Sequence, residues 1–229
     1  MTFRRTMAAL AVTLVTTAGL TVATDVATAP PAHAAVVKKR LVAMTKALPV
    51  ASEVRRGYDR DLFNHWIDAD ADRCDTRREV LIQEATRAPR IAADCSLSGG
   101  RWFSYYDGQT TTGSGTNFDV DHMVPLAEAW DSGARRWDAG TRERFANDLR
   151  DRRALVAVSA SSNRSKSDSD PAQWMPRKAV RCRYVREWVA VKTRWRLTVD
   201  RTEKHALLAT ARGCRNVRVR VRTAPVVLR

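Results

Sequence analysis

The sequence predicts an α+β fold, and three observations favour that class. Two short strands are predicted, one at residues 118–120 and an apolar, β-branched one at 155–158. Apolar residues recur at helical spacing in most of the segments around them. The chain has 229 residues, of which 44% are hydrophobic, so it can bury the core that one or two compact domains require.

The first 34 residues have the pattern of a signal peptide. Arg4 and Arg5 precede an apolar run, Ala8 to Leu20, and Ala32-His33-Ala34 has the small-x-small pattern of a cleavage site. The apolar run is too short and too rich in Thr for a membrane span. We expect a mature chain that begins near Ala35, is secreted to the extracellular space and makes no membrane contact after cleavage.

Residues 35–115 are expected to supply helical and β elements that pack on the core. Amphipathic helices are predicted at 38–48 and 58–67 from the spacing of their apolar residues. A third helix is predicted at 76–86, where Thr76 is a candidate N-cap with an acidic capping-box partner three residues later.

The second half of the chain alternates strands with helices. An aromatic strand is predicted at 101–106, followed by a polar loop at 107–117 whose Gly, Thr and Ser content is typical of a mobile connection. The strand at 118–120 and the strand at 155–158 are separated by a long excursion. Further helices are expected at 126–130, 141–149, 182–195 and 201–212.

The C-terminal segment, residues 215–229, is a basic tail. Val217, Val219 and Val221 alternate with arginines, which predicts a strand with one basic face. A disordered basic arm is an equally good interpretation of the same composition.

Four cysteines lie in the mature part of the chain, and an exported protein with an even number of cysteines is expected to form disulfides. The most economical pairing is Cys74–Cys95 and Cys182–Cys214, although the sequence allows three connectivities. A zinc site is the competing interpretation, but it needs close ligand pairs such as C-x-x-C, which the sequence lacks.

The charge of the chain indicates an anionic partner. Lys and Arg total 40 against 25 Asp and Glu, giving a formal net charge of +15. Such an excess favours nucleic acid, an anionic membrane surface or a cell-wall polymer. A soluble protein with a basic surface and no such partner is the alternative.

Two segments carry residues suited to metal-dependent chemistry. Asp121 and His122 stand together at the end of a predicted strand, and Asn163 follows much later beside Arg164 and Lys166. Carboxylate and amide oxygens suit a hard cation such as Mg²⁺ or Mn²⁺, and a neutral imidazole can accept a proton from water. Basic side chains beside them could hold flanking phosphates.

The longer pattern around these residues resembles the HNH endonucleases and their ββα-metal (His-Me finger) fold. The similarity is greatest to exported actinobacterial-type HNH proteins related to the C-terminal nuclease domain of Gmr-type modification-dependent restriction enzymes. Asn163-Arg164-Ser165-Lys166-Ser167-Asp168 is also similar to the metal-side motif of the HNH domain in RNA-guided CRISPR nucleases. The segments that carry the resemblance are Gly57-Tyr58-Asp59-Arg60, Cys74-Asp75-Thr76-Arg77, Asp119 to Trp130, Ser132-Gly133-Ala134, Phe145 to Leu149, and Asn163-Arg164-Ser165-Lys166 through Asp170 to Pro176.

The resemblance implies a role for each residue. His122 would be the general base, Asp121 and Asn163 would be the metal ligands, and Arg164 and Lys166 would bind phosphates. Asn163 stands where the last His of the family often sits, which shifts the expected metal toward a hard cation, Mg²⁺ first and Mn²⁺ second. The ββα-metal nuclease region would span residues 116–214, and Asn147, as the family's central Asn, would pin the long excursion.

The resulting prediction is a secreted, monomeric, metal-dependent HNH endonuclease that hydrolyses DNA with little sequence specificity. RNA is the second candidate substrate. The main alternative is a secreted protein that binds DNA or an anionic polymer without cutting it. An interbacterial toxin domain is a third hypothesis, which the secretion signal and the lack of a long delivery module disfavour.

An acidic loop resembles a calcium-binding loop. Asp68, Asp70, Asp72 and Glu79 occupy positions one, three, five and twelve of an EF-hand-like pattern. Position six is Arg73 rather than the glycine that such loops require. Whether the loop binds calcium is left open by the sequence.

Overall fold

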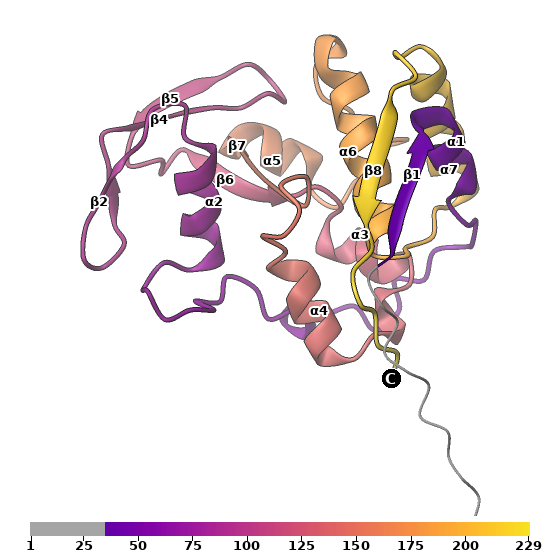
Figure 1. Cartoon of the computed structure of the whole chain (residues 1–229), viewed down its shortest axis with the longest axis horizontal. Coiled ribbons are helices and arrows are strands. Elements are labelled where there is room, and N and C mark those ends of the chain that lie inside the picture. Colours follow the sequence, from indigo (N-terminus) through magenta and orange to yellow (C-terminus); the bar gives the residue numbers. More distant parts are fainter. Residues whose placement is uncertain (1–34) are drawn as a thin grey trace, which may run out of the picture. The chain divides into compact units, whose positions relative to one another are not determined.

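The architecture is α+β, as predicted, in a computed structural model that describes residues 35–229 (Figure 1). The helices are α1 (Leu41–Ala47), α2 (Thr76–Glu84), α3 (Leu126–Asp131), α4 (Ala139–Ala146), α5 (Ala160–Lys166), α6 (Arg181–Arg194) and α7 (Arg201–Arg212). The strands are β1 (Val36–Arg40), β2 (Arg90–Ile91), β3 (Leu97–Ser98), β4 (Gly100–Phe103), β5 (Thr110–Gly113), β6 (Phe118–His122), β7 (Leu155–Ser159) and β8 (Arg218–Arg222). Three short 3-10 helices are η1 (Arg60–Leu62), η2 (Ala134–Arg136) and η3 (Lys178–Val180). The predicted signal peptide, residues 1–34, lies outside the described residues.

β6 and β7 form an antiparallel pair that carries Asp121 and His122. Its register places Asp121 opposite Val156 and His122 opposite Leu155. Every residue of β7 is buried, and α2 and α5 both contact the two strands. The excursion between the strands contains α3, η2 and α4, and α5 begins directly after β7. Asp121 and His122 are therefore fixed at the end of a buried strand.

The two ends of the described chain pair with each other. β1 and β8 form an antiparallel ribbon beside α6 and α1 (Figure 1). Within β8, the side chains of Val219 and Val221 are buried against the protein, while those of the arginines are exposed. The C-terminal segment thus contains a strand rather than a disordered arm. The helix predicted at 38–48 begins only at Leu41, because residues 36–40 find a strand partner far away in the sequence.

The prediction of a helix at 58–67 is wrong. Only η1 is helical there, and Trp66 has a φ of 61°, in the left-handed region that ends any α-helix. The aromatic residues still pack inward: Phe63 is fully buried and its ring lies 6.4 Å from that of Trp130. The apolar spacing correctly placed the aromatic side chains against the core, but Leu62 is 37% exposed and the backbone is not the predicted helix.

Other predicted boundaries shift by a few residues. α2 begins at Thr76 as expected, but Asp75 is the N-cap and its carboxylate accepts a hydrogen bond from the Arg78 backbone amide. The polar segment 107–117 is not entirely loop, because β5 pairs with β4 in a hairpin. The helix predicted at 201–212 has the predicted bounds, with Asp200 as its N-cap.

Both disulfides have the predicted pairing, Cys74–Cys95 and Cys182–Cys214. All four cysteines are used, so the competing zinc site is excluded. The second bridge joins the start of α6 to the residues after α7. The fully buried Lys192 of α6 also forms ion pairs with Glu128 of α3 and Glu203 of α7. Within residues 35–229, none of the helices is long and apolar enough to cross a bilayer.

Candidate functional site

A cavity of about 220 Å³ opens between the end of β6, the residues after it and α5. Asp121, His122, Asn163 and Arg164 all line it, although they come from two distant parts of the sequence. Its other lining residues are Arg60, Val120, Pro125, Leu126, Ser167 and Asp168.

His122 is held in a single tautomer by its backbone partner. Its Nε2 lies 2.8 Å from the carbonyl oxygen of Ala146, at the end of α4. A carbonyl oxygen only accepts, so in the neutral ring Nε2 carries the proton and Nδ1 keeps its lone pair. The ring packs against Trp66 at 5.1 Å and Phe145 at 6.4 Å between centroids. Burial lowers the pKa of His122 to about 3, so the imidazole is neutral at physiological pH.

Asp121 lies in a buried polar network. One carboxylate oxygen accepts a hydrogen bond from the Lys166 ammonium at 2.9 Å, and the other accepts from the Tyr106 hydroxyl at 2.7 Å. Burial raises the pKa of Asp121, and the Lys166 ammonium opposes that shift. The carboxylate is thereby fixed in orientation.

Lys166 does not have the position that its predicted role requires. Its side chain is 0% exposed, and its ammonium also donates to the carbonyl oxygen of His122 at 3.0 Å. A buried ammonium with two protein partners cannot meet a phosphate at the surface, so the expectation that Lys166 binds phosphate is wrong. The sequence shows only a lysine near Asn163 and gives no sign of which way it points.

Asn163 is placed beside β6 by the short helix α5. The Ser159 hydroxyl caps that helix by accepting from the Ser162 amide, and Ser167, with a φ of 49°, ends it. Asn163 Nδ2 donates to Asp119 Oδ2 at 3.0 Å, which leaves the amide oxygen for another ligand. Asp119 and Asp121 share one face of the strand, because alternate residues of a strand point the same way.

Two arginines give the cavity its positive side. Arg164 is exposed on α5, as the prediction for phosphate binding requires, and Arg60 is exposed on η1. Arg60 was missed as a site residue, although it belongs to a segment that carried the family resemblance. Arg55 forms ion pairs with the buried Asp131 at 2.7 Å and with the exposed Asp168, which lines the cavity, at 3.5 Å.

The donors at this cavity fit a hard divalent cation. Asp121 and Asn163 offer carboxylate and amide oxygens, which Mg²⁺ prefers, and no cysteine is free to favour a softer metal. Each Asp121 oxygen accepts one hydrogen bond and retains further lone-pair capacity. The neighbouring Lys166 ammonium already balances the Asp121 charge, which lowers the electrostatic gain of adding a cation there.

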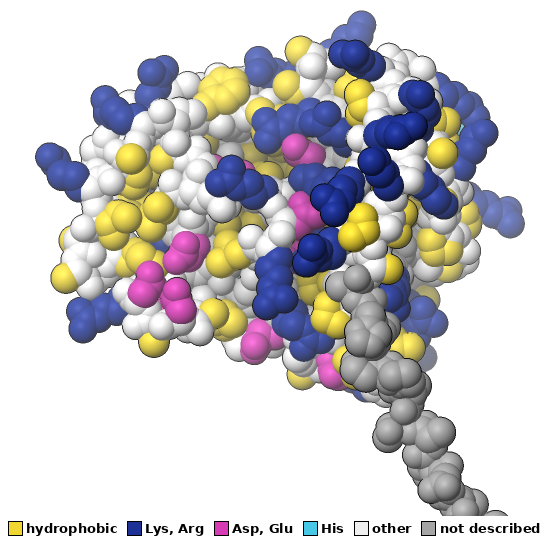
Figure 2. Space-filling view, viewed as in Figure 1, with side chains coloured by type: hydrophobic (Ala, Val, Ile, Leu, Met, Phe, Trp, Pro, Cys, Tyr) yellow, Lys and Arg dark blue, Asp and Glu magenta, His cyan; other side chains and the backbone are white. Residues whose placement is uncertain are grey.

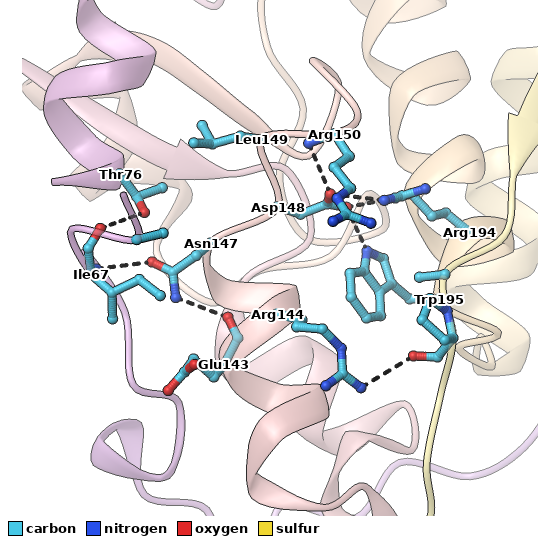
Figure 3. A pocket seen from close by; sticks show the side chains of 13 residues that line it. Ile67, Thr76, Glu143, Arg144, Asn147, Asp148, Leu149, Arg150, Arg194 and Trp195 are labelled. Carbon is cyan, nitrogen blue, oxygen red and sulfur yellow. Dashed lines mark hydrogen bonds and ion pairs between the residues drawn. The ribbon is translucent and has the colours of Figure 1, made fainter. Parts of the chain in front are cut away.

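Asn147 holds the segment that packs against His122. Its amide oxygen accepts from the Ile67 backbone amide, and its amide nitrogen donates to the Glu143 carbonyl oxygen (Figure 3). The same nitrogen also donates to the carbonyl oxygen of Asn64. These bonds join the end of α4 to residues 64–67, the segment that contains Trp66. The residues around it line a separate cavity of about 240 Å³, where Asp148 pairs with Arg194 (Figure 3).

The acidic loop that resembles a calcium site is compact. Carboxylate oxygens of Asp68, Asp70 and Asp72 lie within 4.8 Å of one another on the surface. Arg73 has a φ of 76°, so it adopts the left-handed turn that glycine makes at this position of a calcium loop. Burial, and after it the charges of the three carboxylates, raise the pKa of Glu79.

Comparison with known proteins identifies relatives. Residues 72–210 match the family model for the C-terminal domain of GmrSD restriction endonucleases. An uncharacterised secreted protein of the fungus Arthroderma benhamiae is 40% identical over 159 residues, which is 69% of this chain and 76% of the fungal protein. This relative is fungal, so it does not confirm the actinobacterial type that the sequence pattern suggested. No solved structure matches the chain significantly. The family match covers more than half of the chain, so the chain belongs to the family of GmrSD restriction endonuclease C-terminal domains.

Proposed function

We propose that this protein is a secreted, metal-dependent HNH endonuclease that hydrolyses DNA phosphodiester bonds with little sequence preference. Its membership of a restriction endonuclease domain family supports a nuclease function and a nucleic acid substrate. The observation that carries the proposal is the neutral His122 imidazole, with a fixed tautomer, in a cavity shared with Asp121 and Asn163.

The proposed catalytic core is β6, β7 and α5. An antiparallel strand pair followed directly by a helix is the order expected of a ββα-metal unit. The long excursion between the strands is accommodated because α4 returns to place the Ala146 carbonyl against His122.

His122 is the proposed general base. Nδ1 accepts a proton from the water molecule that attacks phosphorus, while Nε2 keeps its hydrogen bond to Ala146 and holds the ring in place. The negative charge of a bound phosphodiester raises the pKa of this buried imidazole above its value of about 3 and improves it as a base. Asn147 acts as a positioning residue, because it holds the segment that contains Trp66.

Asp121 and Asn163 are the proposed ligands of a divalent metal, Mg²⁺ or Mn²⁺. The metal, when bound, would stabilise negative charge on the phosphate and on the departing oxygen. Tyr106 and Lys166 keep the Asp121 carboxylate in one orientation. Arg60 and Arg164 bind flanking phosphates of the substrate rather than its nucleobases, so they add affinity without sequence preference.

The proposed location is extracellular. The fungal relative is described as secreted, and two disulfides are typical of proteins that fold in an oxidising compartment. The signal-peptide pattern of residues 1–34 agrees with export.

A non-catalytic secreted DNA-binding protein is the second candidate. The specific observation that favours it is the buried Lys166–Asp121 ion pair, because an ammonium in place beside the carboxylate could substitute for the metal. In that case Arg60 and Arg164 would bind DNA that is never cut.

Incubation of the mature protein with duplex DNA, single-stranded DNA and RNA distinguishes the two. Each substrate is tested with Mg²⁺, Mn²⁺, Ca²⁺ and chelator. The proposal predicts cleavage of duplex DNA with Mg²⁺ or Mn²⁺ and none with chelator. Binding of DNA without cleavage under every metal condition would overturn it and favour the second candidate.

A further inference from the structure

The ribbon formed by β1 and β8 has two chemically different faces. Its register sets Lys38 opposite Arg220 and Arg40 opposite Arg218, and paired residues of an antiparallel ribbon point to the same side. All four of these side chains are exposed, whereas Val219 and Val221 face the core. One face therefore packs on the protein, and the other carries these basic side chains together with the exposed Val36 opposite Arg222.

The charges on the outer face have no ion-pair partner within the described part of the fold. Like charges directly opposite each other in an antiparallel pair are destabilising. Among residues 35–229, no carboxylate forms a salt bridge with Lys38, Arg40, Arg218, Arg220 or Arg222. Arg40 donates one hydrogen bond to the Asn216 carbonyl oxygen. Exposed cations that repel one another and pair with no carboxylate are better explained by an anionic partner than by folding.

A cavity extends this basic face sideways. It has a volume of about 290 Å³ and lies between β8 and the loop that precedes β7. Its single acidic residue, Asp151, is occupied by Arg153, which also donates to the Arg220 carbonyl oxygen and joins the loop to the strand. Figure 2 shows Lys and Arg side chains gathered over and beside β8. The lining residues are Arg150, Asp151, Arg152, Arg153, Arg220 and Arg222.

We propose that this surface is a second DNA-binding site, separate from the catalytic cavity. We call it the basic ribbon face and define it as Lys38, Arg40, Arg150, Arg152, Arg218, Arg220 and Arg222. None of these residues lines the cavity that contains His122. The proposal deepens the proposed function, on which it rests for its choice of DNA as the anion.

The chemistry and spacing of the face fit a phosphate backbone. Guanidinium groups match phosphate oxygens with paired hydrogen bonds. Alternate residues of a strand are roughly 6.8 Å apart, so Arg218, Arg220 and Arg222 form a row of roughly 14 Å. A row of that length exceeds what a small anion can contact and suits successive phosphates of an extended polymer. A two-stranded ribbon can also lie along a groove of duplex DNA.

The direct test is the salt dependence of binding. Affinity of the mature protein for a labelled 20-base-pair duplex is measured by fluorescence anisotropy in chelator, so that no cleavage occurs. The variant carries Arg218→Gln, Arg220→Gln and Arg222→Gln. Each lost phosphate contact lowers the slope of log K against log salt by about 0.9, so we expect the slope to fall by about 2–3 and Kd to rise about tenfold or more at 100 mM salt.

A matched control removes the same charge elsewhere. Arg90→Gln, Arg101→Gln and Lys178→Gln lie on exposed positions of β2, β4 and η3. The control should raise Kd by less than about threefold, since only the net charge changes. Equal losses in both triple variants, or an unchanged Kd in the ribbon variant, would overturn the proposal.

Thermal unfolding gives a second readout. Because repulsion between the opposed cations is removed, the ribbon variant should unfold at a Tm equal to that of the parent or about 2–4 °C higher. A drop in Tm would show that the arginines serve the fold and would contradict the proposal. If the parent never cuts DNA but the ribbon variant loses affinity, only the proposed nuclease activity fails; if the parent cuts DNA and the ribbon variant binds normally, only this proposal fails.

Discussion

Replacing Lys166 by methionine should strongly destabilise the fold. The ammonium is fully buried and lies 2.9 Å from Asp121, whose side chain is only 7% exposed. Methionine keeps the length and apolar stem of lysine but leaves the Asp121 carboxylate with the Tyr106 hydroxyl as its one remaining side-chain partner. Removing one partner of a buried ion pair costs about 3–5 kcal/mol, because the other charge stays buried and uncompensated.

Urea denaturation at pH 7.5 in chelator measures this loss. A second variant, Lys166→Met with Asp121→Asn, removes both charges and should recover at least about 2 kcal/mol of the loss. Arg164→Met is the matched control on the same helix; Arg164 is exposed and makes no salt bridge within the described chain, so its replacement should change stability by about 0.5 kcal/mol or less. A Lys166→Met protein as stable as the parent would refute the buried pair.

Three further perturbations follow from the contacts. Burial raises the pKa of Glu84 to about 7 from 4.5, so the folded state loses stability as pH rises through that range; Glu84→Gln should therefore match the parent at pH 4 and exceed it by up to about 3 kcal/mol at pH 8, as measured by urea denaturation at each pH. Replacing Cys182 and Cys214 together by serine opens a loop with a sequence separation of 32 and should cost about 3–4 kcal/mol in the same assay, whereas an unchanged midpoint would contradict a bridge in the folded protein. Arg60→Ala should raise the KM for DNA about tenfold with a smaller change in kcat, and a loss confined to kcat would show that Arg60 does not bind the substrate.

The parts of the fold with local signals could be predicted from sequence. The segments at 118–120 and 155–158 are short runs followed by polar residues, and both form strands within two residues of the predicted bounds. The disulfides were predictable because the most economical pairing closes the two shortest loops. The convergence of Asp121, His122 and Asn163 at one cavity followed from the motif rather than from periodicity.

The remaining features depend on distant contacts. β1 exists only because β8 lies beside it, and nothing in residues 36–40 indicates a partner near the other end of the chain. The orientation of Lys166 depends on a buried carboxylate that lies on another element, and periodicity of a seven-residue helix does not reveal it. Trp66 reaches His122 through a left-handed residue inside a segment whose apolar spacing imitates a helix.

Cleavage of supercoiled plasmid by His122→Ala tests the central claim most directly. The account predicts a rate loss of about 10²–10⁴ with Mg²⁺, while His205→Ala, on the exposed surface of α7, cuts as fast as the parent. His122→Asn is measured beside it, and circular dichroism and Tm verify that each variant is folded. A folded His122 variant that cuts DNA at the parental rate would contradict the assignment of this imidazole as the base.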